Sequence, residues 1–462
     1  MNTRRDIMSG KKNAIPEGGI YNAKELGVPK MLVLGIQHMF AMFGATVLVP
    51  ILTGLDVATT LLMAGAGTLF FHLVTKGKVP AFLGSSFAFL AGYAAIAPAA
   101  GAYGMTQKEL LPYACLGVAA AGLVYLVLAA LIKLVGIKKI MKFFPPVVTG
   151  PIIIAIGLGL AGSAVSNCKD YGTGNMILAV VALLVVIVFN IWGKGMLKII
   201  PILLGVVIAY VVGIGLDFAG FDVVDFTAIK EADIIGLPIH TENTILGIDW
   251  SRTDLIVRSL VAIIPIALAT MMEHIGDISA ISATCGKNYI KDPGLHRTLI
   301  GDGLATSISA VFGGPANTTY GENTGVLALS RVYDPKVIRL AAVFAIILSI
   351  FPKFSAAIET IPTGIIGGIS FVLYGMISAI GVRNLVENKV DFSKSRNLII
   401  AAVILVSALG IKMGTADGSV DIALGSFNVS LTPLAIAAVA GIVLNAILPG
   451  KDFDFNDEAE SK

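Results

Sequence analysis

The chain has 462 residues, of which 56% are hydrophobic and 14% are charged, and its mean hydropathy is +0.86. Soluble proteins carry about 25% charged residues, so this composition argues against a soluble protein and predicts that most of the chain lies in a lipid bilayer. The formal net charge is only +3, and the basic residues form short clusters between apolar runs, which argues against a nucleic-acid partner.

Residues 1–30 precede the first long apolar run and begin with a basic stretch. No short apolar region with a small-residue cleavage site follows, so we expect the first span to stay in the mature protein, with residues 1–30 as a cytoplasmic tail before it. The three cysteines, Cys115, Cys168 and Cys285, lie far apart without metal-ligand spacing. We interpret them as packing residues and expect neither a metal site nor a cofactor.

Apolar runs long enough to cross about 30 Å of hydrocarbon follow one another along nearly the whole chain. We predict an all-α polytopic membrane protein with about fourteen spans, whose boundaries are accurate to several residues. The spans lie near residues 31–51, 57–75, 80–100, 111–135, 145–166, 175–193, 198–216, 257–280, 298–313, 315–333, 336–356, 361–381, 397–412 and 430–448.

Lysine and arginine alternate between the connections, as the positive-inside rule requires of correctly numbered spans. The basic connections hold Lys76 and Lys78, Lys133 to Lys142, Lys194, Lys287 to Arg297, Arg331 to Arg339 and Arg383 to Arg396. The longest of the other connections, 217–254, has eight acidic residues against Lys230 and Arg252, so we predict that it is external. Both termini of this multi-pass protein are then cytoplasmic, and the cell (inner) membrane is the expected location.

Two predicted spans, the third and the tenth, contain Pro and Gly where a helix would be interrupted. They read VPAFLGSSFAFL at 79–90 and GGPANTTYGENTG at 313–325, and we predict short extended segments in both. Interrupted segments at corresponding places in two halves indicate a transporter site built on inverted repeats. Two seven-span halves necessarily have opposite orientations, because seven is odd.

Four acidic residues, Glu273, Asp277, Asp302 and Glu322, fall inside apolar spans or at their edges. Each costs about 2.5–3.5 kcal/mol at the bilayer centre, so together they would oppose insertion by roughly 10 kcal/mol. Residues of this kind usually face a cavity. The alternative is a structural tie to a basic residue, which applies most to Asp302 because Arg297 is near it in sequence.

Glu273 and Asp277 are four residues apart, so a helix places both on one face, and Gly276 between them would allow close backbone approach. That face is a candidate wall for substrate and protons, since a carboxyl group shielded from water can exchange a proton in the physiological range. His38 is a further candidate proton carrier, with a packing role as the equal alternative. His72 is interpreted as structural.

The segment before Glu322 is expected to be non-helical, so the first N–H groups of the following helix would point into the cavity. The 79–90 segment would do the same from the opposite side. Two facing N–H clusters with a carboxylate suit a flat, neutral ligand that carries both carbonyl and N–H groups. A nucleobase is such a ligand.

One glycine motif has a different interpretation. Gly157, Gly159 and Gly162 match GxGxxG but lie in an apolar run without a preceding strand, so we expect them to pack helices together. The sequence has no HExxH, GxSxG or paired Ser and Lys arrangement, and an intramembrane enzyme is not expected.

The residues above resemble the nucleobase-ascorbate transporter family, also called nucleobase cation symporter 2, and within it the bacterial members that carry uracil. The resemblance rests on GIQHMFAMFGATVLVP, LGSSFAFL, MEHIGD, GDGLA and TYGENTGVLALSRV, in this order, and covers all the spans. It implies two inverted seven-span repeats, with a core domain at 31–142 and 255–358, a gate domain at 143–254 and 359–450, and a cytoplasmic tail at 451–462.

The resemblance also assigns six residues to the base. Two carboxylates would accept hydrogen bonds from its ring N–H groups, two backbone N–H groups would meet its carbonyls, and two tyrosines would line the pocket from the core and the gate. In that order these are Glu273 and Glu322, Phe87 and Gly321, and Tyr320 and Tyr374.

Proton coupling would use Glu273, Asp277, His38 and Asp302. The implied function is a proton-coupled symporter that imports a nucleobase, uracil first, by alternating access, with a homodimer through the gate domain. Glu322 favours a pyrimidine, because purine members of the family usually have Gln there. A purine permease for xanthine or urate stays an alternative, since some uracil carriers have His where Asp277 stands. An anion exchanger of similar architecture is a more distant alternative.

Overall fold

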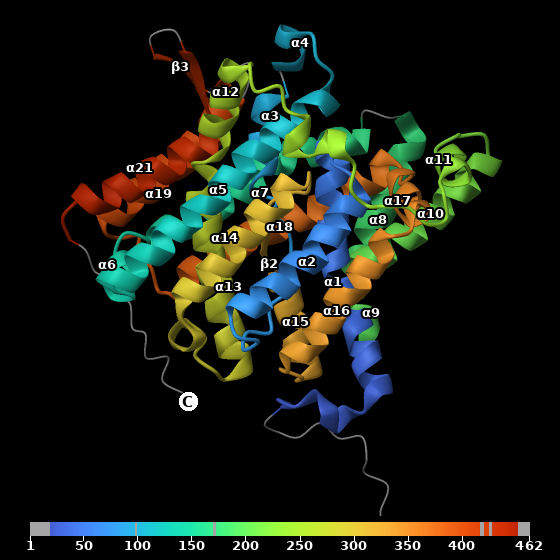
Figure 1. Ribbon diagram of the computed structural model, residues 1–462, viewed down its shortest axis with the longest axis horizontal. Helices are drawn as coiled ribbons and strands as arrows, with labels where there is room; N and C mark the ends of the chain where they lie inside the picture. Colours follow the sequence, from blue (N-terminus) through green and yellow to red (C-terminus); the bar gives the residue numbers. More distant parts are fainter. Residues whose placement is uncertain (1–18, 98, 170–171, 416–419, 425–426, 451–462) are drawn as a thin grey trace, which may run out of the picture.

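The computed structural model describes residues 19–97, 99–169, 172–415, 420–424 and 427–450. The predicted tail at 451–462 and residues 1–18 of the predicted tail at 1–30 lie outside the described residues. The described chain is a bundle of tilted helices with two short strands at its centre and a hairpin at one end (Figure 1).

The first half of the chain runs from a short 3₁₀ helix through ten α-helices and one strand. Its elements are η1 (Ala23–Leu26), α1 (Val28–Thr53), α2 (Val57–Val74), β1 (Leu83–Ser85), α3 (Leu90–Ile96), α4 (Ala99–Tyr103), α5 (Gln107–Val135), α6 (Ile137–Met141), α7 (Pro146–Lys169), α8 (Gly172–Trp192), α9 (Met196–Ile199) and α10 (Pro201–Phe218).

The second half begins in the long acidic connection and ends in the last apolar helix. Its main elements are α11 (Thr227–Glu231), α12 (Thr253–Ile263), α13 (Ile266–Cys285), α14 (Leu295–Val311), β2 (Asn317–Thr319), α15 (Gly321–Ser330), α16 (Pro335–Ser349), α17 (Pro352–Glu359), α18 (Thr363–Glu387), α19 (Ser395–Leu405), α20 (Ile411–Gly414), β3 (Val420–Leu424), β4 (Phe427–Leu431) and α21 (Pro433–Ile447).

The helices confirm a polytopic membrane protein. In the described part of the chain, nine helices are long and apolar enough to cross a membrane, or ten if α16 and α17, bent by 86°, form one span. The other four predicted spans correspond to shorter pieces: α3, α14, α15 and α21. Each predicted span therefore coincides with a helix, a bent helix pair, or a strand followed by a helix.

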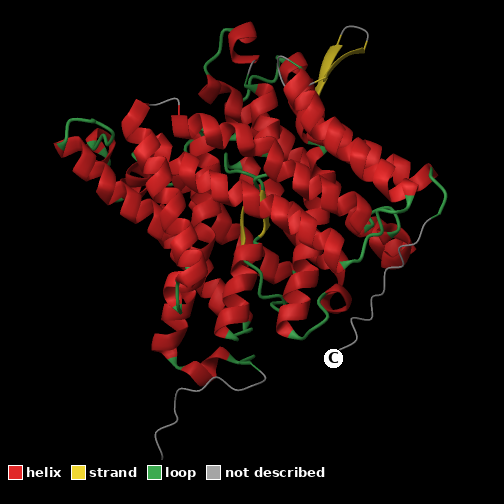
Figure 2. Ribbon diagram, turned by 180° about the vertical axis from the view of Figure 1, so that it is seen from behind, coloured by secondary structure: helices red, strands yellow, loops and turns green. Residues whose placement is uncertain are grey.

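The two interrupted segments form the central strands, as predicted. β1 and β2 pair antiparallel, with Leu83 opposite Thr319 and Ser85 opposite Asn317. Figure 2 shows this pair enclosed by helices in the middle of the molecule. Backbone groups that leave a helix at membrane depth must find partners inside the protein. The strands pair with each other, and the Thr68 and Thr306 hydroxyls bond to outward-facing groups of the two strands.

The packing of the helices repeats between the two halves. Helix α2 of the first half packs against α16 of the second half. Their counterparts in the other half, α14 and α5, pack against each other in the same way. Two further pairs of contacts correspond in the same way. α8 contacts α18 as its counterpart α19 contacts α7, and α10 contacts α8 as its counterpart α21 contacts α19. Three contacts, α2 with α14, β1 with β2 and α7 with α18, are their own counterparts, so the pseudo-two-fold axis passes through them.

Glycines allow α18 to approach its neighbours closely. A Cβ atom on Gly364 would lie 2.0 Å from the Asn175 carbonyl oxygen of α8, and one on Gly157 of α7 would lie 2.3 Å from the Tyr374 carbonyl oxygen. Gly157 thus packs helices as predicted. The prediction is wrong for the other two glycines of its motif, Gly159 and Gly162, because a Cβ atom on either would meet no atom within 4 Å.

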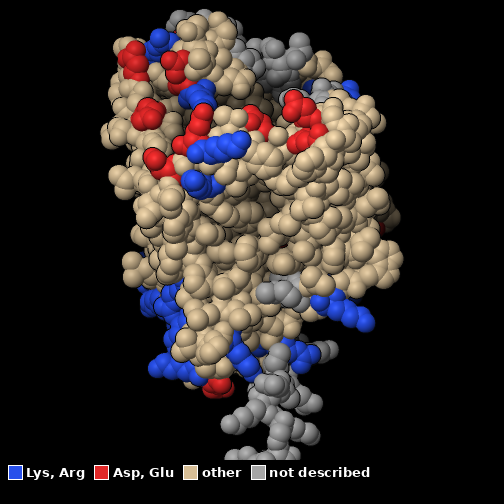
Figure 3. All heavy atoms as spheres, turned by 90° about the vertical axis from the view of Figure 1, so that its right-hand side faces the viewer, with Lys and Arg blue, Asp and Glu red and all other residues tan. Residues whose placement is uncertain are grey.

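Charge separates toward the two ends of the molecule. Figure 3 shows mostly lysines and arginines at the lower end, a broad uncharged band above them, and most of the visible acidic side chains near the upper end, together with several basic ones. The band is the surface expected to face lipid. The two ends therefore have the unequal charge that the alternation of the connections predicts.

Candidate functional site

Tyr320 joins the two interrupted segments. It follows β2 directly, and its backbone N–H donates to the Phe82 carbonyl oxygen at 3.0 Å. Its hydroxyl donates to the Ser85 carbonyl oxygen at 2.9 Å and lies 3.1 Å from the Thr46 hydroxyl of α1. The Tyr320 side chain is buried, so it fixes the end of β2 against β1 and α1.

The four predicted carboxylates form one electrostatic cluster beside this crossing. Glu273 and Asp277 lie on α13, Asp302 on α14 and Glu322 in the first turn of α15, and their charges act on one another. Glu322 is exposed, the two α13 carboxylates are partly buried, and Asp302 is fully buried. Among the described residues no lysine or arginine forms an ion pair with any of them.

The expected alternative for Asp302, a tie to Arg297, does not hold. Arg297 instead donates to the Val74 carbonyl oxygen at 3.1 Å. Asp302 lies beside His274, whose Nδ1 is 3.4 Å from the Asp302 Oδ2. In the part of the chain that the structure describes, no group of three or more His, Cys, Asp or Glu side chains could hold a metal ion.

The N-terminus of α15 opens toward the same carboxylates. Tyr320, which precedes the helix, makes no side-chain hydrogen bond to the first turn of α15. A Cβ atom on Gly321 would lie 3.5 Å from the Asp277 Oδ1. Gly276 is exposed, and a Cβ atom there would meet no atom within 4 Å. The expectation that Gly276 allows close backbone approach is therefore wrong: it leaves open space between Glu273 and Asp277.

Two polar residues that were not predicted link the buried carboxylates. The Thr319 hydroxyl lies 3.3 Å from the His274 Nδ1 and donates to the Asp277 Oδ2, also at 3.3 Å. Together with the contact between His274 and Asp302, this makes a continuous chain from α14 through α13 and β2. The sequence held a signal for both residues, since His274 follows Glu273 within MEHIGD and Thr319 precedes Tyr320.

The two candidate histidines have separate positions. His38 on α1 is fully buried, and Asn323 donates from its Nδ2 to the His38 carbonyl oxygen at 3.0 Å and contacts the His38 Nδ1 at 3.2 Å. His38 thus holds α1 to α15 next to Glu322, outside the chain that joins Asp277 and Asp302. His72 contacts the Ala81 carbonyl oxygen through Nε2 at 2.9 Å, which is the structural role expected of it.

Phe87 and Tyr374 meet each other at the opposite side of the crossing. Their ring centroids are 5.9 Å apart at an interplanar angle of 83°, an edge-to-face contact between the segment after β1 and α18. Both side chains are buried. The structure thus brings together a residue predicted to offer its backbone N–H, Phe87, and a residue predicted to line the pocket, Tyr374, one from each predicted domain.

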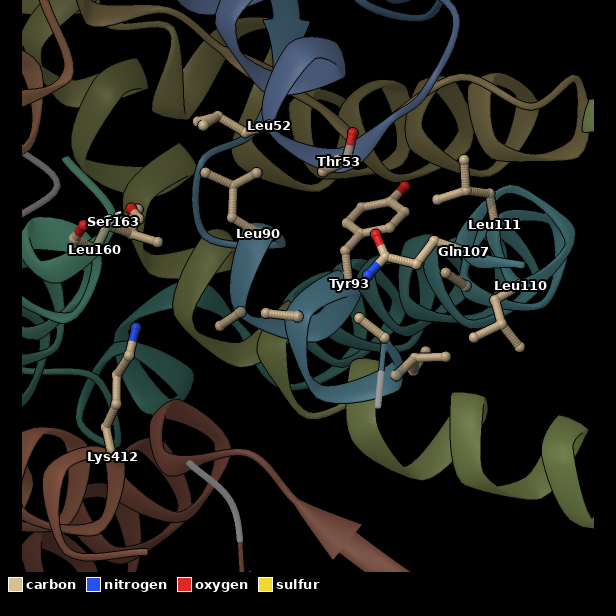
Figure 4. A pocket seen from close by; sticks show the side chains of 15 residues that line it. Leu52, Thr53, Leu90, Tyr93, Gln107, Leu110, Leu111, Leu160, Ser163 and Lys412 are labelled. Atoms are coloured by element: carbon tan, nitrogen blue, oxygen red, sulfur yellow. Dashed lines mark hydrogen bonds between the residues drawn. The ribbon is translucent and has the colours of Figure 1, made fainter. Parts of the chain in front are cut away.

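A cavity of about 190 Å³ lies between α1, α3, α5, α7 and α20, and a second of about 100 Å³ extends to Phe87. None of the four carboxylates lines either cavity. Figure 4 shows Lys412 reaching from α20 toward the larger one, which Thr53 and Ser163 also line. The Lys412 ammonium donates to the Gly159 carbonyl oxygen of α7.

Comparison with known proteins gives consistent relatives along most of the chain. A family model described as a permease family matches residues 29–416. The uracil permease of Bacillus caldolyticus is 43% identical over 432 residues, covering 92% of this chain and 93% of that protein. The uracil permease of Bacillus subtilis (strain 168) is 40% identical, covering 92% and 94%. The putative pyrimidine permease RutG of Escherichia coli (strain K12) is 37% identical, covering 96% and 95%.

Solved structures share the fold at much lower identity. The transmembrane domain of the cyanobacterial bicarbonate transporter BicA matches with a TM-score of 0.65 at 17% identity, covering 85% of this chain and 97% of that chain. SLC26A9 matches with a TM-score of 0.64 at 13% identity, covering 92% and 66%. At these identities the similarity concerns the fold alone.

Proposed function

This chain belongs to the permease family whose model matches residues 29–416, and we propose that it imports uracil together with protons. One observation carries the proposal. Glu322 stands in the first turn of α15, where the two interrupted segments cross, exposed and without a basic partner among the described residues. Relatives named uracil permease, about as long as this chain, support the choice of base.

The chemistry of uracil matches the groups at the crossing. The base has two ring N–H donors and two carbonyl acceptors in one plane. The carboxylates of Glu273 and Glu322 can accept from the N–H groups, while the backbone N–H groups of Phe87 and Gly321 can donate to the carbonyls. Tyr320 and Tyr374 then contribute contact area to the ring rather than further charge.

The division into moving parts supports alternating access. We assign residues 31–142 and 255–358 to a core domain that carries the base, and residues 143–254 and 359–450 to a gate domain. The contact of Phe87 with Tyr374 lies between them. A homodimer would form through the gate domain, whose outer helices α8 and α10 expose large apolar side chains.

Proton coupling supplies the driving force. Glu273 and Asp277 are the proposed proton acceptors, with Asp302 and His38 supporting the pathway within the core. One charge crossing about 100 mV provides roughly 2.3 kcal/mol, enough to concentrate a neutral base about 50-fold. A single proton per base is therefore sufficient for modest accumulation.

Uptake of labelled bases into cells without their own permeases tests the function. We expect saturable uracil uptake that collapses when a protonophore is added. Uptake of xanthine but not of uracil would show that the substrate is a purine instead. Uracil uptake that is indifferent to the protonophore would remove the proton from the mechanism.

Cysteine labelling tests the proposed orientation in the inner membrane. Leu237, which is 84% exposed, lies in the acidic connection, and Glu387 lies at the end of α18 before a basic connection. In a chain with Cys168 replaced by serine, we expect a membrane-impermeant maleimide to label Leu237→Cys in intact cells and Glu387→Cys only after permeabilisation. Cys115 and Cys285 are buried and should stay unlabelled. The reverse pattern would place the termini outside.

A further inference from the structure

His274 is a fully buried titratable residue on α13 that the proposed recognition of the base does not use. We propose that His274, acting through Thr319, transmits the protonation of the carboxylate pair Asp277 and Asp302 to strand β2, which leads directly into the base-binding residues. The inference rests on the proposed proton-coupled function and names a positioning residue for it.

The geometry places a single nitrogen between the two carboxylates. The His274 Nδ1 lies 3.4 Å from the Asp302 Oδ2 and 3.3 Å from the Thr319 Oγ1, and the Thr319 Oγ1 lies 3.3 Å from the Asp277 Oδ2. The His274 Nε2 is buried and has no hydrogen-bond partner among the described residues. Contacts of the histidine with both carboxylates therefore depend on Nδ1 alone.

This arrangement has two consistent hydrogen-bond patterns. When Asp277 is ionised, the Thr319 hydroxyl donates to it and accepts from an N–H at the His274 Nδ1, which lies beside the Asp302 carboxylate. When Asp277 takes up a proton, its own O–H donates to Thr319, and the Thr319 hydroxyl donates to Nδ1. The N–H bond at Nδ1 breaks, an O–H bond forms on the Asp302 Oδ2, and His274 keeps its N–H at Nε2. The single added proton thus reverses both hydrogen bonds of the Thr319 hydroxyl.

The reversal acts on the strand that holds the base. Thr319 is the last residue of β2, and Tyr320 and Gly321 follow it. Because Thr319 pairs with Leu83 of β1, a change at its side chain bears on both interrupted segments. The chain thus connects proton uptake at α13 with the position of the N–H groups at the start of α15.

In the part of the chain that the structure describes, the titratable and aromatic groups around His274 come from several elements. α14 presents Asp302, α15 presents Glu322, and α5 presents the Tyr125 hydroxyl, which donates to Thr270 at 2.6 Å. α2 presents the uncharged Phe71, whose ring centroid is 6.4 Å from that of the imidazole. On its own helix the neighbours are Glu273 and Asp277.

The test compares proton-driven accumulation with base exchange in proteoliposomes of the full chain. Exchange of labelled for unlabelled base needs no net proton movement, whereas accumulation under an imposed pH gradient does. For His274→Phe and Thr319→Val we expect accumulation to fall about 10-fold, within the range of typical coupling energies, and its pH profile to flatten. Exchange should stay within about 2-fold of wild type, and Thr319→Ser, which keeps the hydroxyl, should restore accumulation.

Thr318→Val is the matched control. Its hydroxyl is buried on the same strand but has no hydrogen-bond partner among the described residues, so accumulation should be unchanged. Wild-type accumulation and pH profile in Thr319→Val would overturn the proposal, and so would equal losses of exchange and accumulation. If His274→Phe does not reach the membrane, the comparison of Thr319→Val with Thr319→Ser tests the proposal on its own. A wild-type chain that exchanges no base would instead refute the proposed function.

Discussion

Replacing Glu322 by glutamine is expected to lower kcat/KM for uracil uptake by roughly 10- to 150-fold. A hydrogen bond to a charged group contributes about 1.5–3 kcal/mol. Glutamine replaces one of the two carboxylate oxygens by an NH2 group, which donates a hydrogen bond where the carboxylate accepted one. The substitution preserves size, and Glu322 is an exposed residue whose loss should not unfold α15. The effect should therefore appear in transport and not in the amount of protein in the membrane.

Uptake kinetics with labelled uracil, alongside quantified membrane protein, measure this effect. Glu387→Gln is the matched control, because the same change falls on a side chain that is 64% exposed and pairs with Arg383 one turn earlier. It should leave uptake unchanged. Unaltered uracil kinetics in Glu322→Gln would refute the assigned role, whereas a gain of xanthine uptake would show that position 322 selects between base classes.

Gly84→Ala is expected to destabilise the folded protein and to eliminate transport. A Cβ atom at this position in β1 would lie 2.6 Å from the Thr46 hydroxyl and 2.7 Å from the Tyr320 ring. The ring cannot move freely, since its hydroxyl is bonded to the Ser85 carbonyl oxygen. Overpacking of a tight interior costs about 1–3 kcal/mol, and relief would require β1 and β2 to separate.

Thermal unfolding in detergent and uptake in cells measure the two consequences separately. Gly215→Ala is the control, because Gly215 lies in helix α10 and a Cβ atom there would meet no atom within 4 Å. It should be neutral or slightly stabilising, as alanine has the higher helix propensity. A Gly84→Ala protein with normal stability and normal uptake would mean that the strand crossing tolerates added volume.

The fold was predictable where local chemistry sets it. Apolar length gives the spans, and Pro and Gly at 79–90 and 313–325 give the extended segments, because a helix cannot continue through them. The glycines Gly159, Gly162 and Gly276 were misjudged for a physical reason. Small size shows that a helix can be approached closely, but which side has a neighbour depends on how the helix is turned in the bundle.

The candidate site was predictable in composition but not in connection. Intramembrane charge identifies Glu273 and Glu322 without any structure, since the cost of burying them requires a compensating role. The link from Asp302 through His274 to Thr319 depends on three elements that are far apart in sequence, and only their packing brings them together. The separation of His38 from this link has the same origin.

The pairing of β1 with β2 has a consequence for how such carriers diversify. The pair is held by main-chain bonds, which form whatever side chains the strands bear. Residues bordering it can therefore be exchanged during evolution without dismantling the scaffold, provided that the glycine at the crossing remains. Substrate preference is free to drift while the architecture around it stays constant.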